Sequence, residues 1–165
     1  MNKKIGIYPG TFDPITNGHL DIIIRSMKIV DTLIISIANN SNKKPLFSID
    51  ERISMIKKDI SSIKIAKDKS INVTKFNGLL TSFAKKNKAN CIIRGLRAVS
   101  DFEYEFQMTG MNYRLNSNIE TIFLMSTEKN LFISSNFIKE VHYLGGNVNN
   151  FVSQFVLKKL NKKNK

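Results

Sequence analysis

Five short runs of apolar, mostly β-branched residues alternate along this chain with longer stretches whose apolar residues recur at three- and four-residue steps. The short runs are typical of buried strands, and the longer ones of amphipathic helices. Strands that alternate with helices predict an α/β fold, in which a parallel sheet is covered on both faces. The expected strands are Ile5–Tyr8, Leu33–Ala38, Ile71–Phe76, Cys91–Ile93 and Thr121–Met125. Ile71–Phe76 alternates apolar with polar residues, which favours a place at the edge of the sheet.

The loop Gly10-Thr-Phe-Asp-Pro-Ile-Thr-Asn-Gly-His19 follows the first expected strand, which Pro9 and Gly10 should end. A helix is expected to begin after Thr16 and Asn17, because both are good N-cap residues. Its free backbone amides and positive dipole end would face the end of the strand, where phosphate is the usual guest. His19 adds a donor in the first turn, although such a histidine taken alone is more often structural than catalytic.

Basic residues follow two other strands. The loop after the second strand carries Lys43 and Lys44, and Arg94-Gly-Leu-Arg97 leaves the fourth. The carboxyl ends of parallel strands are where open α/β sheets bind ligands, and a guanidinium matches the oxygens of a phosphate. Two alternatives stay open: the lysines are solvated, or the arginines form ion pairs with Asp101 and Glu103.

The remaining helices have recognisable starts and ends. Ser48 and Glu51 have the spacing of a capping box, and Ile49, Ile53, Ile56 and Ile60 form the expected buried stripe. Capping-box spacing recurs at Ser100–Glu103. Phe132-Ile-Ser-Ser-Asn136 leads into a helix that Gly145-Gly146 should end, and capping alone would explain Ser134 and Ser135.

Three blocks of the chain together resemble a known family. They are Tyr8–His19, which ends in Thr16-Asn-Gly-His19, then Ile93–Glu105, and then Phe132–Ser135. They resemble the nucleotidylyltransferase superfamily, whose mark is a His/Thr-x-Gly-His turn, and within it the bacterial phosphopantetheine adenylyltransferases. The likeness covers roughly residues 3–160. It implies a Rossmann-like, doubly wound sheet of five parallel strands in a single domain over residues 1–165.

The resemblance also implies an activity. Members of this family transfer AMP from ATP to 4′-phosphopantetheine, which gives dephospho-coenzyme A and pyrophosphate in coenzyme A biosynthesis. The acceptor phosphate attacks the α-phosphorus of ATP in line. Because that phosphate is already ionised at neutral pH, the chemistry needs positioning and charge neutralisation more than a general base.

The family pattern assigns roles to individual residues of this chain. It implies catalytic roles for His19, Lys43 and Arg94, and acceptor contacts for Thr11, Lys43, Leu80 and Arg94, although Leu80 could equally be a core residue. The implied ATP contacts are Thr11, Phe12, His19, Gly95, Leu96, Arg97, Glu105, Asn130, Leu131, Phe132, Ile133, Ser134, Ser135 and Asn136.

Two positions depart from the family pattern. Asn130 stands where relatives often carry tryptophan, so any stacking by that ring is missing. Asn136 stands where serine or threonine is common, and an asparagine there can still cap a helix and donate a hydrogen bond.

The net charge of +13 and the pI near 9.9 are compatible with a polyanionic partner. The lysines are scattered, however, and the only dense cluster is the tail 158–165, which we expect to fray. An RNA-binding module is the rival of another class, but the chain lacks the aromatic motif of an RRM and the Gly-x-x-Gly loop of a KH domain. We therefore expect no nucleic-acid partner and assign most of the charge to a solvated surface.

Other features bear on location and cofactors. A single cysteine, Cys91, suits a reducing cytoplasm, and no apolar stretch is long enough for a membrane span. No cluster of ligand residues has the spacing of a metal site, so Mg²⁺ should arrive bound to ATP, with no metal held by protein side chains. The resemblance implies a homo-hexamer, at which Phe102, Phe106 and Met108 on one helix only hint.

The nearest enzymatic alternative keeps the fold and changes the acceptor, for example to nicotinate mononucleotide or glycerol phosphate. The blocks Arg94–Arg97 and Asp101–Glu105 favour phosphopantetheine as the acceptor.

Overall fold

The computed structural model describes residues 3–39, 44–97, 99–131 and 133–163, with the backbone alone at 99–101. Five parallel strands form one sheet in the order β3-β2-β1-β4-β5, so the predicted five-stranded parallel fold is confirmed. The strand order reverses between β1 and β4, which is where doubly wound sheets bind ligands. The strands are β1 Ile5–Gly10, β2 Thr32–Ala38, β3 Ser70–Phe76, β4 Cys91–Leu96 and β5 Glu120–Met125.

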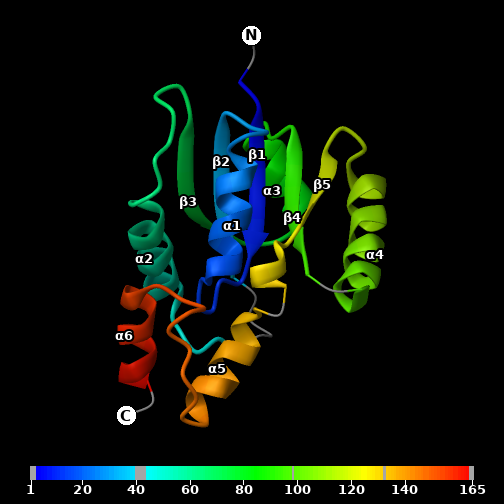
Figure 1. The fold of residues 1–165 in the computed structure, drawn as a ribbon. Coiled ribbons are helices and arrows are strands. Elements are labelled where there is room, and N and C mark those ends of the chain that lie inside the picture. Colours follow the sequence, from blue (N-terminus) through cyan, green and yellow to red (C-terminus); the bar gives the residue numbers. More distant parts are fainter. Residues whose placement is uncertain (1–2, 40–43, 98, 132, 164–165) are drawn as a thin grey trace.

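Helices cover both faces of the sheet, with α1 in front of it and α3 behind it in Figure 1. The larger core contains apolar residues of β1, β2, α1, α2 and α6, and the smaller core contains Ile7, Ile34 and Ile92 with Ala84 of α3. The helices are α1 Asn17–Ser26, α2 Ile49–Ile60, α3 Leu80–Lys86, α4 Val99–Leu115, the 3₁₀ turn η1 Glu128–Asn130, α5 Ser135–Tyr143 and α6 Gln154–Lys163.

Strand β1 does not end at Tyr8, as the sequence predicted, but pairs with β2 through Pro9 and Gly10. Its pairing with β4 stops much earlier, at Ile7 and Ile92. The carbonyl of Pro9 faces the β4 side, where it accepts a hydrogen bond from Arg94 Nη1 at 3.0 Å. The amide and carbonyl of one strand residue point to the same side, so an N–H at Pro9 would also face β4. The pairing with β4 has already ended there, and the strand therefore loses no ladder hydrogen bond by having proline at this position.

Helix α2 begins with the predicted capping box. The Ser48 amide donates to the Glu51 carboxylate at 2.8 Å, and the Glu51 amide donates to Ser48 Oγ at 3.2 Å. The predicted buried stripe is only partly correct, because the buried residues are Arg52, Met55, Ile56 and Asp59, while Ile49, Ile53 and Ile60 are half-buried. The burial of a charged residue, Arg52, could not be expected from a pattern of apolar spacing.

The C-terminal segment does not fray from residue 158, because α6 continues to Lys163. Val156 and Leu160 are buried in the larger core, which explains why this lysine-rich stretch is ordered. Lys163 Nζ lies 3.1 Å from the Glu51 carboxylate and 5.6 Å from the centre of the Phe47 ring, so it joins α6 to the start of α2. Residues 164–165 lie outside the described part of the chain.

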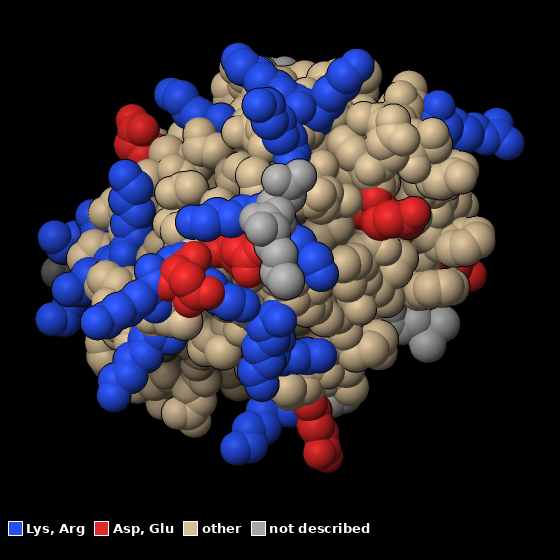
Figure 2. Space-filling view, turned by 90° about the horizontal axis from the view of Figure 1, so that it is seen from above, with Lys and Arg blue, Asp and Glu red and all other residues tan. Residues whose placement is uncertain are grey.

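Basic side chains are spread over the end of the molecule from which the N-terminus emerges, as Figure 2 shows. By topology this is the end where the strands begin, and exposed lysines such as Lys3, Lys4, Lys67 and Lys88 precede β1, β3 and β4. Part of the positive charge therefore lies at the amino ends of the strands. Within the described residues, no helix has the length and apolar character that crossing a membrane requires.

Candidate active site

A pocket of about 450 Å³ lies at the carboxyl ends of the strands. The final residues of three strands line it, Gly10 of β1, Ala38 of β2 and Phe76 of β3, together with Arg94 and Gly95 of β4. The pocket therefore occupies the place that the strand order indicates for a ligand. Residues of α1, α4 and the start of α5 complete its wall.

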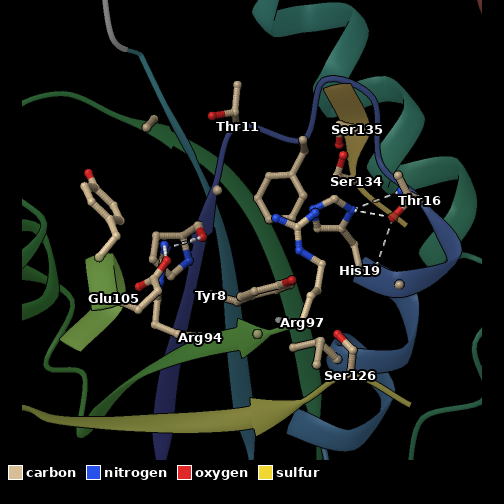
Figure 3. A pocket seen from close by; sticks show the side chains of 18 of the residues that line it. Tyr8, Thr11, Thr16, His19, Arg94, Arg97, Glu105, Ser126, Ser134 and Ser135 are labelled. Carbon is tan, nitrogen blue, oxygen red and sulfur yellow. Dashed lines mark hydrogen bonds and ion pairs between the residues drawn. The ribbon is translucent and has the colours of Figure 1, made fainter. Parts of the chain in front are cut away.

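His19 is held in one orientation by the N-cap of its own helix. Its amide donates to Thr16 Oγ1 at 3.4 Å, and its ring Nδ1 accepts from the Thr16 amide at 3.1 Å. Thr16 Oγ1 also lies 2.8 Å from Nδ1 (Figure 3). Because Nδ1 acts as an acceptor, the hydrogen of a neutral ring must be on Nε2. His19 thus occupies the capping-box position usually taken by Glu or Gln.

The imidazole of His19 stays neutral at physiological pH. Burial, and then the nearby positive charge of Arg97, lower the pKa of His19 from 6.5 to about 4. The ring lies against Phe12, with 5.1 Å between ring centres. A neutral imidazole with its hydrogen on Nε2 can donate to an oxyanion without adding a full charge to a site that already holds two arginines.

Phe12 has an unusual backbone conformation within the first loop. Its φ of +50° lies in the left-handed region, which is uncommon for a residue with a side chain, while the ring is 1% exposed. Glycine is required at position 10, because a Cβ there would lie 2.8 Å from the Phe12 ring. The small residue at position 10 therefore makes room for the Phe12 ring.

Arg94 is anchored from two sides. Its Nε donates to one oxygen of the Glu105 carboxylate at 2.7 Å, its Nη2 contacts the other oxygen, and its Nη1 donates to the Pro9 carbonyl at 3.0 Å. The partner of Arg94 is thus Glu105 and not Glu103, one of the two carboxylates of the earlier alternative, while the side chain of Asp101, the other one, lies outside the described residues. These contacts use three of the five N–H donors of the guanidinium and leave two of them without a partner among the described residues.

The N-terminus of α5 forms another part of the pocket. Ser134 is the N-cap, since its Oγ accepts from the Phe137 amide at 3.0 Å, and Ser135 Oγ donates to the Pro14 carbonyl at 2.7 Å. Asn136 is exposed and lines the pocket, but it is not the cap. Arg97 Nη1 donates to the Ile133 carbonyl at 3.3 Å, which joins the end of β4 to this turn.

A buried ion pair ties these segments together. Asp13, which is 3% exposed, accepts from the amides of Leu46 and Phe47, each at 2.9 Å, and pairs with Lys139 Nζ of α5 at 2.7 Å. Arg52, equally buried, donates to the carbonyls of Phe47 at 3.0 Å and of Thr11 at 2.9 Å. The first loop, the segment before α2, and α5 are therefore held by charged groups that sequence reasoning did not identify.

Most of the predicted site residues meet in this pocket, and a few do not. Leu96 is buried in β4, and Asn130 turns its side chain to Thr127 Oγ1 at 2.8 Å. Neither they nor Leu131 line the pocket. Lys43 and Phe132 lie outside the described residues, and the neighbouring Lys44 is exposed away from the lining. The predicted residues that do line it are Thr11, Phe12, His19, Leu80, Arg94, Gly95, Arg97, Glu105, Ile133, Ser134, Ser135 and Asn136.

Sequence reasoning missed several lining residues. Tyr8 was assigned to a buried strand, and Thr16 was recognised only as a cap. The residues of α4 carry a signal that could have revealed them, because Tyr104, Met108 and Asn112 follow one another at four-residue steps and so share one face of the helix with Glu105. No group of three or more His, Cys, Asp or Glu capable of holding a metal ion occurs among the residues that the structure describes.

Known proteins are similar to this chain over most of its length. A family model described as Cytidylyltransferase-like matches residues 7–141. The phosphopantetheine adenylyltransferase of Rhodospirillum centenum is 54% identical, over 97% of this chain and 87% of the relative. The phosphopantetheine adenylyltransferase of Wolbachia pipientis subsp. Culex pipiens is 56% identical, over 97% of this chain and 93% of the relative.

A solved structure shares the fold. It is a bifunctional NMN adenylyltransferase/ADP ribose pyrophosphatase from Francisella tularensis, complexed with AMP and a Mn ion, with a TM-score of 0.66 and 20% identity. The match covers 92% of this chain and 44% of that one, so the likeness concerns one part of the larger protein.

The state of His19 can be tested by a pH titration. We expect the His19 ring signals in NMR to keep the shifts of a neutral Nε2–H tautomer until the pH approaches 4. Since the unfolded chain takes up this proton near pH 6.5, His19 lowers the free energy of unfolding as the pH falls from 6.5 toward 4. The signal is assigned by its loss in His19→Gln, and a midpoint near 6.5 would contradict the buried, neutral ring.

Proposed function

Since the chain belongs to the phosphopantetheine adenylyltransferases, within the cytidylyltransferase-like family, we propose that it transfers AMP from ATP to 4′-phosphopantetheine. The products are dephospho-coenzyme A and pyrophosphate. The observation that carries the proposal is the pocket itself, in which a neutral histidine donor, two arginines and the N-termini of α1 and α5 meet at the carboxyl ends of the strands.

The reaction requires a donor for the charge that grows on the α-phosphate. The acceptor phosphate is ionised at neutral pH and attacks the α-phosphorus in line, so no side chain has to remove a proton. Charge then accumulates on the non-bridging oxygens in the transition state. The Nε2–H of His19, held by the Thr16 cap, is placed to donate to one of these oxygens without reorientation.

The remaining basic groups divide between the two substrates. Arg94 keeps two N–H donors for the acceptor phosphate, while Glu105 and the Pro9 carbonyl fix the plane of its guanidinium. Lys43, from the loop after β2, is the second proposed acceptor contact. Arg97 and the capped N-terminus of α5 face the phosphates of ATP that leave as pyrophosphate.

We propose that a divalent cation, Mg²⁺, enters with ATP. Among the described residues, Asp13 and Glu105 of this region are already bound to Lys139 and Arg94, so the donors left in the pocket suit an ion held mainly by phosphates and water. When bound, the ion would neutralise charge on the triphosphate. The bifunctional Francisella tularensis protein, one part of which shares this fold, was solved with AMP and a Mn ion.

The single cysteine supports a cytoplasmic location. Cys91 is a buried free thiol in β4, which fits a reducing compartment such as the cytoplasm.

The activity is tested directly with ATP and 4′-phosphopantetheine, by measuring pyrophosphate and identifying the adenylylated product by mass. Nicotinate mononucleotide and glycerol phosphate serve as alternative acceptors. Turnover with phosphopantetheine and not with the other two supports the proposal, and turnover with either alternative instead would overturn the assignment of the acceptor.

His19→Gln separates the two functions of this residue. Glutamine at this helix position can still accept from the Thr16 amide, so the melting temperature should stay near that of the wild type, whereas His19→Ala loses this bond and about 1 kcal/mol. Both variants should lower kcat by about 10²- to 10³-fold, the loss of one donor to a developing oxyanion. The KM for ATP should change far less. Near-normal kcat in the glutamine variant would show that His19 only caps the helix.

Glu105→Gln tests whether Glu105 positions Arg94 or contacts the nucleotide. Loss of the charge loosens the guanidinium, so the KM for 4′-phosphopantetheine should rise about tenfold or more while the KM for ATP changes little. Glu103→Gln, an exposed neighbour on α4, is the matched control. An increase confined to the KM for ATP would assign Glu105 to the nucleotide, as the family resemblance implies.

The family resemblance implies a homo-hexamer, and we propose that α4 contributes to the contacts between its copies. The helix exposes more than a third of each of seven large residues; Tyr104 and Met108 line the pocket, and the exposure of the other five is unusual for a surface that faces only water. Sedimentation at micromolar concentration should give the hexamer, and Phe106→Glu should weaken it; a wild-type monomer would contradict the prediction. The seven residues are Phe102, Tyr104, Phe106, Met108, Met111, Tyr113 and Leu115.

A further inference from the structure

The hydroxyl of Tyr8 is a polar group that the reaction described above does not use. Tyr8 lies in β1 at the centre of the sheet, and its side chain is 6% exposed and lines the pocket. The ring packs edge-on against Phe12, with 5.4 Å between ring centres, and lies 6.4 Å from the His19 ring. The ring is therefore fixed by its neighbours, and so is the direction of the hydroxyl.

The hydroxyl points toward the part of the pocket that Arg97 and His19 form (Figure 3). Figure 3 shows the ring between the Arg94–Glu105 pair and His19, with the oxygen on the side of Arg97 and His19. Gly95 also lies close to it, since a Cβ at that position would be 3.7 Å from the Tyr8 oxygen. The same Cβ would lie 3.2 Å from Ile22, so the absence of a side chain at residue 95 lets β4 pack closely beside Tyr8 and Ile22.

Among the described residues, the Tyr8 hydroxyl makes no hydrogen bond, yet it is not one of the polar atoms sealed inside the core. A hydroxyl removed from bulk water costs free energy when it lacks a partner, so a partner from the pocket side would be favourable. Burial raises the pKa of the Tyr8 phenol well above its ordinary value, although Arg94 and Arg97 oppose this. The group therefore keeps its hydrogen and can donate it.

We propose that the Tyr8 hydroxyl donates a hydrogen bond to a phosphate oxygen of a bound substrate, which makes Tyr8 a further substrate-binding residue. The inference rests on the proposed function for the identity of the substrates. An anionic oxygen is the fitting acceptor, because the hydroxyl is directed toward Arg97 and His19, with Arg94 on the other side of the ring (Figure 3). The phosphate belongs either to ATP or to the acceptor, and the separate KM values distinguish these two sources.

Tyr8→Phe removes the hydroxyl and keeps the ring. A hydrogen bond to a charged acceptor predicts a fall in kcat/KM of about 10- to 100-fold, with the melting temperature unchanged or slightly higher. A rise in KM for ATP alone identifies an ATP phosphate, and a rise for phosphopantetheine alone identifies the acceptor phosphate. Tyr143→Phe, which removes an equivalent hydroxyl from a residue that is 79% exposed, is the control and should leave kcat/KM unchanged.

Wild-type kcat/KM in Tyr8→Phe would overturn the inference and leave the proposed function intact. Calorimetric titration with ATP and with free 4′-phosphopantetheine distinguishes the opposite failure. If the wild type transfers no adenylyl group but binds one of these ligands at least tenfold more tightly than Tyr8→Phe, the tyrosine contact stands and the proposed function fails. Equal affinities of both proteins for both ligands, together with equal kcat/KM, would exclude the contact.

Discussion

A buried carboxylate costs free energy unless hydrogen bonds and an opposite charge compensate for the lost water. Asp13 meets this condition with two backbone amides of the segment before α2 and the ammonium group of Lys139 on α5. Its three donors come from segments more than 30 residues away, so the compensation is possible only when the first loop, the α2 entry and α5 come together. The contacts that compensate for the burial of the Asp13 charge therefore also bring together the three segments that form the pocket.

Neutrality at His19 follows from the same assembly. The closed loop removes the ring from water, and Arg97 adds positive charge nearby, so the imidazole gives up its proton and keeps a single N–H for the pocket. A protonated ring would have a second donor, but its positive charge would be repelled by the nearby arginines, and burial would leave that charge poorly solvated. A fixed neutral donor that needs no reorganisation is the arrangement that stabilises a developing charge most effectively.

The sequence predicted the parts of the structure that depend on local spacing. Strand and helix alternation, the Ser48–Glu51 capping box and the Thr16 cap were all identified correctly, because each depends on residues within a few positions of one another. The errors concern long-range partners. Neither the burial of Arg52 nor the continuation of α6 beyond residue 158 could be read from spacing, since the first depends on the Thr11 carbonyl and the second on packing of Leu160 in the core. Family resemblance indicated twelve of the 25 residues that line the pocket, although it did not show that Glu105 holds Arg94.

The pairing between β1 and β4 is the shortest in the sheet and forms a seam between its two halves. In the described residues only two residue pairs join β1 to β4, whereas six join β1 to β2 and six join β4 to β5. Beyond Ile7 and Ile92 the two halves are connected by the Arg94 side chain, which reaches the Pro9 carbonyl. A substrate that contacts His19 on one side and Arg94 on the other spans this seam. Bound substrate would thus connect the two halves of the sheet where the hydrogen bonds between β1 and β4 have stopped. The gap in the backbone ladder provides the space for the substrate, and the substrate in turn stiffens the sheet at this gap.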